Sequence, residues 1–355
     1  MRLNQAFRRS LSYVRWSTRG NVHLRRTKFL IILTPPLRLL GKSNIRLTGA
    51  GLGTAPIGST KEWKGVFWGD TEEKVGIETV IAAIDSGINW IDTAPFYGWG
   101  RAERIVGTAL KESKLRREDV FIFTKCGILR DSSGDDYMDL RPATIRGEIE
   151  DSLRRLQTDY VDLYQIHDVD PRVPIEDSWR EIYRLVDRGC VRYAGLSNHP
   201  LDLVERAMRI GPVTSLQEQY NPIYRKTEVL FPFLSSHEVG LLSWGSLAEG
   251  FLADDFDLEK LDPNDFRRTR RNYERRERYD TIERIREKLI EIASSKKTTL
   301  ASLVIAWELS HRELTGAIVG AKAPREAREL ANASMVQLTK DEILAFEEAI
   351  SLWNF

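Results

Sequence analysis

An acid and an aromatic hydroxyl lie close together where a short apolar stretch gives way to a glycine-containing loop. Asp92 directly follows the stretch 89–91, and Tyr97 lies five residues further, just before Gly98 and Gly100. A carboxylate at the end of a buried strand, followed by a hydroxyl in the next loop, is typical of an active site. We expect the partners of these two groups to follow other apolar stretches of the chain.

Lys125 and His167 are such partners, because each closes a stretch of β-branched and aromatic residues. A tyrosine hydroxyl has a pKa near 10, so alone it is a poor proton donor or acceptor at neutral pH. The ammonium of Lys125 is expected to lower the pKa of Tyr97, and Asp92 to keep that ammonium charged. His167 is expected to hydrogen-bond a substrate oxygen. The chemistry predicted is acid-assisted attack on a carbonyl group.

The elements that must position these groups are strands alternating with helices, the pattern of a parallel sheet. We count about eight units over roughly 290 residues, which predicts a closed (β/α)8 TIM barrel. A Rossmann sheet is the rival, but Gly49, Gly51 and Gly53 do not have the Gly-x-Gly-x-x-Gly spacing. The expected strands are 49–54, 89–91, 120–125, 160–167, 191–197, 215–219, 240–244 and 316–320. The expected helices are 72–86, 101–113, 142–156, 175–187, 201–210, 227–237, 280–294 and 299–310, with short ones after Pro324 and Thr339.

Nearly every expected strand ends in a polar or planar side chain, and in a TIM barrel these ends share one rim. No Gly-x-Ser-x-Gly motif is present, and the five histidines lack zinc spacing, so acyl transfer and metal-assisted hydrolysis are not indicated. Hydride transfer would need a cofactor. A Schiff-base aldolase with Lys125 as nucleophile is an alternative, although it needs a neutral lysine and Asp92 favours a charged one.

The motifs resemble those of the aldo-keto reductase family, of the bacterial type. The likeness runs from about Leu39 to Phe355 and rests on several short segments. These are Asp-Thr-Ala-x-x-Tyr-Gly at 92–98, Thr-Lys at 124–125, Gln-Ile-His at 165–167, Gly-Leu-Ser-Asn at 195–198, Gln-Tyr-Asn at 219–221 and Val-Gly-Ala-Lys at 319–322. The resemblance implies a catalytic tetrad of Asp92, Tyr97, Lys125 and His167, with Tyr97 as general acid and base.

The resemblance also implies a nicotinamide cofactor bound without a Rossmann fold, and no metal. The expected cofactor contacts are Thr54, Asp92, Ser197, Asn198, Gln217, Trp244, Leu247, Gly250, Gly320, Ala321, Lys322, Arg325 and Glu326. NADP is favoured because Lys322, Arg325 and Arg328 offer charge to a 2′-phosphate; Glu326 opposes it, so NAD is the alternative. Trp68, Phe96 and Trp99 are expected to line the substrate side.

The function implied is NAD(P)H-dependent reduction of an aldehyde, ketone or sugar, or the reverse oxidation. A regulatory subunit that binds NADPH with little turnover is the alternative, and the oligomeric state stays open. With 42% hydrophobic residues, 30% charged residues and a net charge of +1, composition favours neither a nucleic-acid partner nor a membrane. Two cysteines, Cys126 and Cys190, fit a reducing cytoplasm.

Residues 1–36 differ from the remaining chain, which we expect to be the barrel domain, 37–355. They contain eight lysines or arginines and no acid. We expect a disordered basic extension, with an organellar transit peptide as the alternative. A second unusual stretch, between Phe251 and Tyr279, holds seven arginines and two glutamates from Arg267 to Arg278. It is expected to be a solvated loop, or a flap that attracts an anion over the cofactor.

Overall fold

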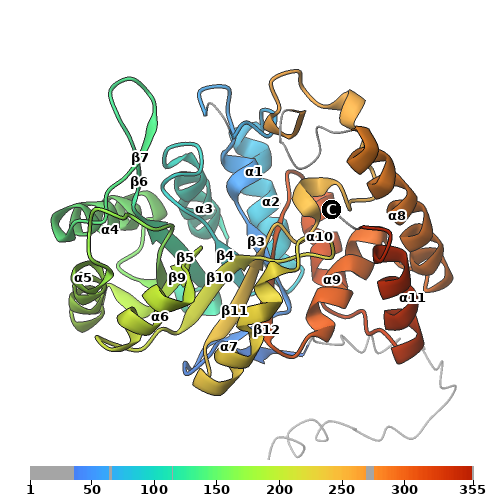
Figure 1. Ribbon diagram of the computed structural model, residues 1–355. Helices are drawn as coiled ribbons and strands as arrows, with labels where there is room; N and C mark the ends of the chain where they lie inside the picture. Colours follow the sequence, from blue (N-terminus) through green and yellow to red (C-terminus); the bar gives the residue numbers. More distant parts are fainter. Residues whose placement is uncertain (1–35, 64–65, 114, 269–275, 354–355) are drawn as a thin grey trace, which may run out of the picture. The chain divides into compact units, whose positions relative to one another are not determined.

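The computed structural model describes residues 36–63, 66–113, 115–268 and 276–353 (Figure 1). Eight parallel strands close into a barrel, as the alternating pattern predicted, and the last of them pairs with the first. They are β3 (Ala50–Gly53), β4 (Trp90–Asp92), β5 (Phe121–Cys126), β8 (Val161–Ile166), β9 (Val191–Ser197), β10 (Ser215–Gln219), β11 (Gly240–Trp244) and β12 (Leu314–Gly320).

Helices cover the outside of the barrel, and most of them are amphipathic, whereas Leu300–Ser310 is apolar and mostly buried (Figure 1). They are α1 (Ala55–Gly58), α2 (Glu73–Asp85), α3 (Arg101–Glu112), α4 (Pro142–Leu156), α5 (Ile175–Asp187), α6 (Leu201–Met208), α7 (Phe231–His237), α8 (Arg276–Ser295), α9 (Leu300–Ser310), α10 (Pro324–Ala333) and α11 (Lys340–Ile350). The helix expected over 227–237 is divided into a 3-10 turn, Lys226–Leu230, and α7. Pro232 explains the division, because proline is tolerated in the first turn of a helix but not inside one.

A tryptophan fills the barrel interior and accounts for one glycine on each of the first and last barrel strands. Trp90 on β4 is fully buried, and its indole N–H donates to the carbonyl oxygen of Thr48 at 2.9 Å. A Cβ atom on Gly51 would lie 2.1 Å from the Trp90 ring, and one on Gly316 would lie 2.7 Å from it. The large ring therefore requires glycine on two neighbouring strands.

The amino-terminal end of the barrel is closed by a hairpin that the sequence pattern did not predict. Strand β1 (Arg38–Leu39) pairs antiparallel with β2 (Arg46–Leu47). Leu40, Ile45 and Leu47 from this segment are buried against the apolar interior that includes Trp90. This apolar closure leaves the opposite rim, at the carboxyl ends of the strands, as the place for polar chemistry.

Two insertions rise from that opposite rim. Strands β6 (Ile128–Arg130) and β7 (Asp136–Met138) form a second hairpin directly after β5, and it was not predicted either (Figure 1). The described part of the long interruption after β11 contains three short 3-10 helices, Ala248–Gly250, Leu258–Lys260 and Phe266–Arg268. The predicted basic extension lies outside the described residues except for Pro36. No described helix is both long and apolar enough to cross a membrane.

Candidate active site

Strand β4 ends on Asp92, and the loop that follows it holds Tyr97 against the first βα loop. Gly98 makes this close packing feasible, since its φ is +60° and a Cβ there would lie 1.9 Å from the carbonyl oxygen of Gly58. Only glycine combines that left-handed backbone with that proximity. The glycine after the tyrosine, noted in the sequence, therefore fixes where the phenol lies.

Lys125 joins the acid and the phenol inside the barrel. Its ammonium donates to Asp92 Oδ1 at 2.5 Å and to the carbonyl oxygen of Thr93 at 3.1 Å, and lies 3.2 Å from the Tyr97 hydroxyl. The side chains of Lys125 and Asp92 are fully buried. The structure thus brings Lys125 of one strand to the acid and the phenol that the sequence placed at the end of another strand and in the loop after it.

The second oxygen of Asp92 is held by two glutamine amides. Gln217 Nε2 donates to Asp92 Oδ2 at 2.8 Å, and Gln165 Nε2 lies 3.3 Å from the same oxygen. Gln217 was expected to contact a cofactor; it does line the cavity, but its amide nitrogen is engaged by the carboxylate. Both carboxylate oxygens of Asp92 are therefore engaged, one by an ammonium and the other by neutral amide donors.

The pKa of Tyr97 departs from the expected direction. Burial raises it above its ordinary value, and the charge of Asp92 adds to this effect. The ammonium of Lys125 does lower it, as expected, but burial outweighs that effect. Tyr97 is consequently a protonated phenol at neutral pH, ready to donate.

Lys125 stays charged in spite of its burial. Burial disfavours the ammonium, but the negative charge of Asp92 and the oxygen of Tyr97 outweigh it, so the pKa of Lys125 is raised. A Schiff-base lysine must instead be a neutral amine. The aldolase alternative therefore conflicts with this environment.

His167 follows β8 and faces the phenol. Its ring packs edge-on against Tyr97 with centroids 5.8 Å apart and against Phe96 at 5.9 Å. Burial and the nearby charge of Lys125 hold the pKa of His167 well below its usual range. Asn198 Nδ2 donates to the carbonyl oxygen of His167 at 3.1 Å. The imidazole is therefore neutral and has a fixed position, which suits hydrogen bonding to a substrate oxygen.

A cavity of about 600 Å³ opens at this rim and extends toward β12 and α10. Its described lining includes Tyr97, Asp92 and His167, with Lys125 lying beneath them. It also includes the other expected contacts Thr54, Trp68, Phe96, Ser197, Asn198, Gln217, Trp244, Leu247, Gly250, Gly320, Ala321, Lys322, Arg325 and Glu326. Trp99 is not among the lining residues. Its ring lies behind Phe96, with centroids 5.4 Å apart, and under the guanidinium of Arg130.

The residues beside the tetrad suit a carboxamide-bearing planar ring. Ser197 Oγ is buried and has no hydrogen-bond partner among the described residues, so it is available to a ligand. Trp244 presents its ring to the cavity, and its indole N–H donates to Asn198 Oδ1 at 3.0 Å. Asn198 thus fixes both the indole and the backbone of His167. The Ser197 hydroxyl, which has no partner among the described residues, next to the fixed ring of Trp244 suits the nicotinamide end of a dinucleotide.

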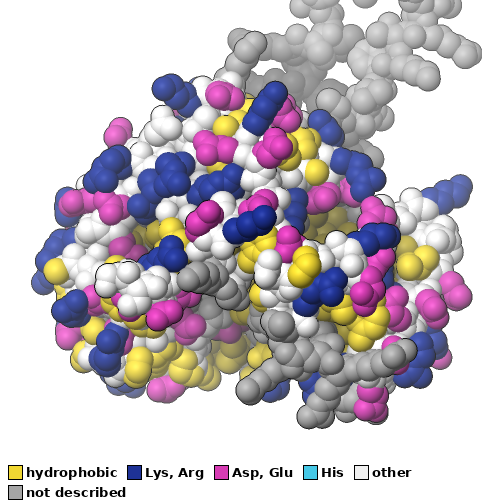
Figure 2. Space-filling view, turned by 90° about the horizontal axis from the view of Figure 1, so that it is seen from above, with side chains coloured by type: hydrophobic (Ala, Val, Ile, Leu, Met, Phe, Trp, Pro, Cys, Tyr) yellow, Lys and Arg dark blue, Asp and Glu magenta, His cyan; other side chains and the backbone are white. Residues whose placement is uncertain are grey.

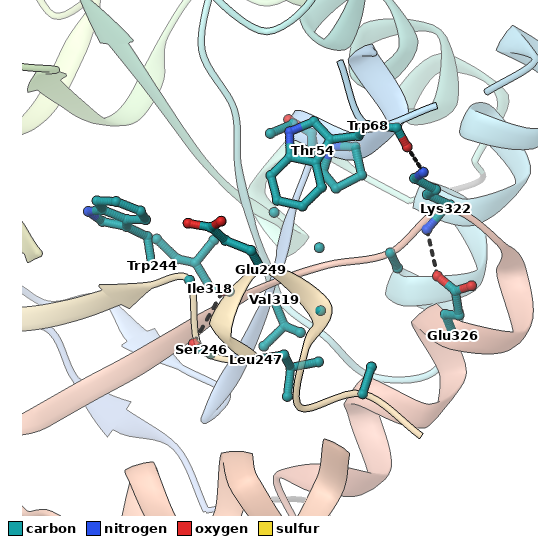
Figure 3. A pocket seen from close by; sticks show the side chains of 18 of the residues that line it. Thr54, Trp68, Trp244, Ser246, Leu247, Glu249, Ile318, Val319, Lys322 and Glu326 are labelled. Carbon is teal, nitrogen blue, oxygen red and sulfur yellow. Dashed lines mark hydrogen bonds between the residues drawn. The ribbon is translucent and has the colours of Figure 1, made fainter. Parts of the chain in front are cut away.

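The far end of the cavity carries the groups expected near the adenosine (Figure 3). The ammonium of Lys322, at the end of β12, donates to the carbonyl oxygen of Trp68, and the backbone N–H of Lys322 donates to Glu326 Oε2 at 2.8 Å. Arg325 is exposed and pairs with Asp255 at 3.0 Å. Each of these bases already has a partner, so a phosphate would compete with existing contacts.

Arg267 also lines the cavity and was missed as a single residue, although the arginine cluster that it begins was noted. Two hydrogen bonds, at 2.8 Å and 2.7 Å, hold its guanidinium on Asp265. The same group lies 5.1 Å from the centroid of the Trp68 ring and donates to the carbonyl oxygen of Glu249 at 3.3 Å. A fixed, largely buried cation in the cavity wall is suited to an anionic ligand.

Comparison with known proteins agrees with the geometry of this rim. A model of the aldo/keto reductase family matches residues 51–351. The chain belongs to the aldo/keto reductase family. It is 31% identical to the NADH-specific methylglyoxal reductase of Escherichia coli over 87% of this chain and 96% of that enzyme. It is 39% identical to the aldo-keto reductase YhdN of Bacillus subtilis, a match that covers 60% of this chain and 62% of that protein.

A solved structure agrees with this assignment. The glycerol dehydrogenase of Gluconobacter oxydans superposes with a TM-score of 0.79 at 29% identity, covering 89% of this chain and 95% of that one. As an aldo-keto reductase, the chain is an NAD(P)H-dependent oxidoreductase that acts on a small-molecule carbonyl compound. The comparisons do not favour the regulatory-subunit alternative.

Proposed function

We propose that Tyr97 is the general acid with which this reductase converts an aldehyde or ketone into an alcohol. When bound, a nicotinamide cofactor would supply the hydride that the carbonyl carbon needs. The hydroxyl of Tyr97 gives its proton to the carbonyl oxygen, which leaves a phenolate 3.2 Å from the ammonium of Lys125. That ammonium, held charged by Asp92, is the observation that supports the assignment, because it stabilises the phenolate as it forms.

In this proposal His167 positions the substrate. Its neutral imidazole adjoins Tyr97, so its ring N–H can donate to the same carbonyl oxygen. Two named relatives, a methylglyoxal reductase and a glycerol dehydrogenase, suggest small oxygen-rich substrates. The free thiols Cys126 and Cys190 support a cytoplasmic location as part of the proposal.

Turnover with purified protein tests the function. We expect NADPH or NADH oxidation that depends on added aldehyde, followed at 340 nm, with small aldehydes, sugars and quinones as trial substrates. Tight NADPH binding by titration, with no aldehyde-dependent oxidation of either cofactor across that panel, would instead favour the regulatory alternative.

The raised pKa of Tyr97 predicts opposite pH dependences for the two directions. Reduction needs the protonated phenol, so its kcat/KM should stay level from about pH 6 to 9 and fall only above about pH 10. Oxidation of the alcohol needs the phenolate, so its kcat/KM should rise with pH throughout that range. Rate profiles for one aldehyde and its alcohol check this. A reductive profile that fell through an inflection near pH 7 would argue against Tyr97 as the acid.

We propose that the cofactor is NADPH and that Lys322 and Arg325 bind its 2′-phosphate. Both line the end of the cavity beside α10, whose N-terminus also favours an anion. The observation that favours NADH is the acidity of the same end: Asp255 pairs with Arg325, and Glu326 lies in the first turn of α10.

Two substitutions decide between the cofactors. Lys322→Ala should raise the Kd for NADPH strongly and that for NADH little. Glu326→Gln keeps an acceptor for the Lys322 N–H and should tighten NADPH binding by about 1 kcal/mol, as expected for a partly exposed charge. Both effects should shrink at high salt. Fluorescence titration with each cofactor measures them. If each substitution changed the Kd values for NADPH and NADH by the same factor, neither side chain would contact the 2′-phosphate.

A further inference from the structure

The substrate end of the cavity has mostly apolar walls. Trp63 and Phe96 pack edge-to-face with centroids 5.2 Å apart, and Trp63 also packs against the ring of Tyr97 at 6.0 Å. Val66 from the first βα loop and Ile128 from the β6–β7 hairpin complete this wall. Such a surface suits the carbon skeleton of a small molecule, and the indole N–H of Trp63, which has no hydrogen-bond partner among the described residues, adds a polar donor.

A second carboxylate besides that of Asp92, the side chain of Asp168, lies at this end of the cavity. It directly follows His167, is exposed and lines the same cavity. Its Oδ1 accepts the backbone N–H of Val169 at 2.7 Å, which fixes the side chain locally. Among the described residues, no lysine or arginine forms an ion pair with Asp168. The carboxylate therefore has no cationic partner among the described residues, and it lies in the cavity wall beside His167.

The groups around Asp168 do not supply the missing positive charge. Burial keeps the pKa of His199 below its ordinary value, so His199 is neutral at pH 7. Glu218 is a second acid, whose pKa is raised to about 7 by burial and by the charge of Asp168. Arg130, on the neighbouring hairpin, lies over Trp99 and donates to the carbonyl oxygen of Gly134, outside the described cavity lining.

The rest of this face carries charges of both signs. Lysines and arginines alternate with acids over the loop side of the molecule, so no single sign dominates it (Figure 2). The bases that line the cavity include Lys322 and Arg267, at the end near Trp68 and α10. Nearer to Asp168, the charge of Lys125 acts on His167, but that ammonium is already paired with Asp92 at 2.5 Å.

We propose that Asp168 is a specificity-determining residue that selects uncharged, hydroxyl-bearing carbonyl compounds and rejects those with a carboxylate or phosphate. This inference rests on the proposed function. The carboxylate is an acceptor that a substrate hydroxyl can satisfy, while the aromatic walls take the C–H faces of the same molecule. A substrate anion would meet like charge next to His167, where the carbonyl must bind.

A pair of aldehydes that differ only in charge tests the rejection of anions. We compare kcat/KM for methyl 4-formylbenzoate, which is neutral, with that for 4-carboxybenzaldehyde, which is anionic at pH 7. The wild type should prefer the ester, and Asp168→Asn should shrink that preference by a factor of about 5 to 10, as expected for removing one nearby charge. The asparagine can still accept the Val169 N–H, so the loop should keep its conformation.

Two control variants separate local from global charge. Asp168→Glu keeps the charge and should keep the ester preference. Asp187→Asn removes a charge from an exposed position at the end of α5, outside the described lining, and should also keep it. The effect of Asp168→Asn should weaken at high salt, because the carboxylate is exposed to solvent.

A second pair tests the preference for hydroxyl groups. The wild type should favour glyceraldehyde over propanal, and Asp168→Leu, which removes the acceptor, should lose most of that preference. The inference is wrong if Asp168→Asn keeps the ester preference unchanged, or if Asp168→Leu keeps the glyceraldehyde preference unchanged. As long as these variants still reduce neutral aldehydes, such a result would leave the proposed function intact. Failure of the wild type to reduce any of the four aldehydes with either cofactor would instead count against the proposed function.

Discussion

Tyr97→Phe should lower kcat for carbonyl reduction by a factor of about 100 or more, because it removes the proton donor and leaves the ring in place. The hydroxyl lies 3.2 Å from the ammonium of Lys125, and the ring packs against Trp63 and His167. These ring contacts should survive the substitution. Steady-state kinetics with one aldehyde, together with cofactor titration, measure the effect.

The cofactor Kd is the internal control for this variant. It should stay within about twofold of the wild type, since phenylalanine keeps the shape of the cavity wall. A matched variant, Tyr137→Phe, removes a hydroxyl from an exposed position on β7, outside the described lining, and should leave kcat unchanged. If Tyr97→Phe kept activity within about threefold of the wild type, another group would have to be the acid.

The barrel and its polar rim could be predicted from the sequence because the signal is repeated. Asp92 ends its apolar strand, Lys125 is the last residue but one of β5, and His167 follows β8, and parallel strands bring their carboxyl ends to one rim. Hydrophobic periodicity needs only neighbouring residues, so the helices between the strands were visible too. The two hairpins were missed because their strands are only two or three residues long.

Side-chain direction and burial could not be predicted in the same way. The sequence indicates that Lys125 is near Tyr97, which alone predicts a lowered pKa; the raised pKa depends on burial by segments distant in the chain. Trp99 has a φ of +55°, and its ring lies under Arg130, outside the described lining; neither feature could be predicted from the sequence. Arg267 lies in a loop without periodicity, and only the folded chain brings it to Trp68.

Removing Lys125 should reduce both stability and activity. Lys125→Met leaves the buried carboxylate of Asp92 without its ammonium, and such an unpaired buried charge destabilises a protein by about 3–5 kcal/mol. The same change removes the cation that stabilises the Tyr97 phenolate, so kcat should fall by a factor of about 100 or more. Denaturant unfolding and steady-state kinetics measure the two losses.

The double variant Asp92→Asn/Lys125→Met separates the two roles. It removes both charges, and the asparagine stays close to its glutamine neighbours, so it should recover much of the stability that Lys125→Met loses. It should not recover kcat, because the phenolate still lacks a cation. Lys74→Met, on the exposed face of α2, is the control for loss of a lysine. If Lys125→Met matched the wild type in its free energy of unfolding, the buried carboxylate of Asp92 would not need the ammonium of Lys125 as a partner. If the double variant regained kcat, the ammonium would have no role in the proton transfer.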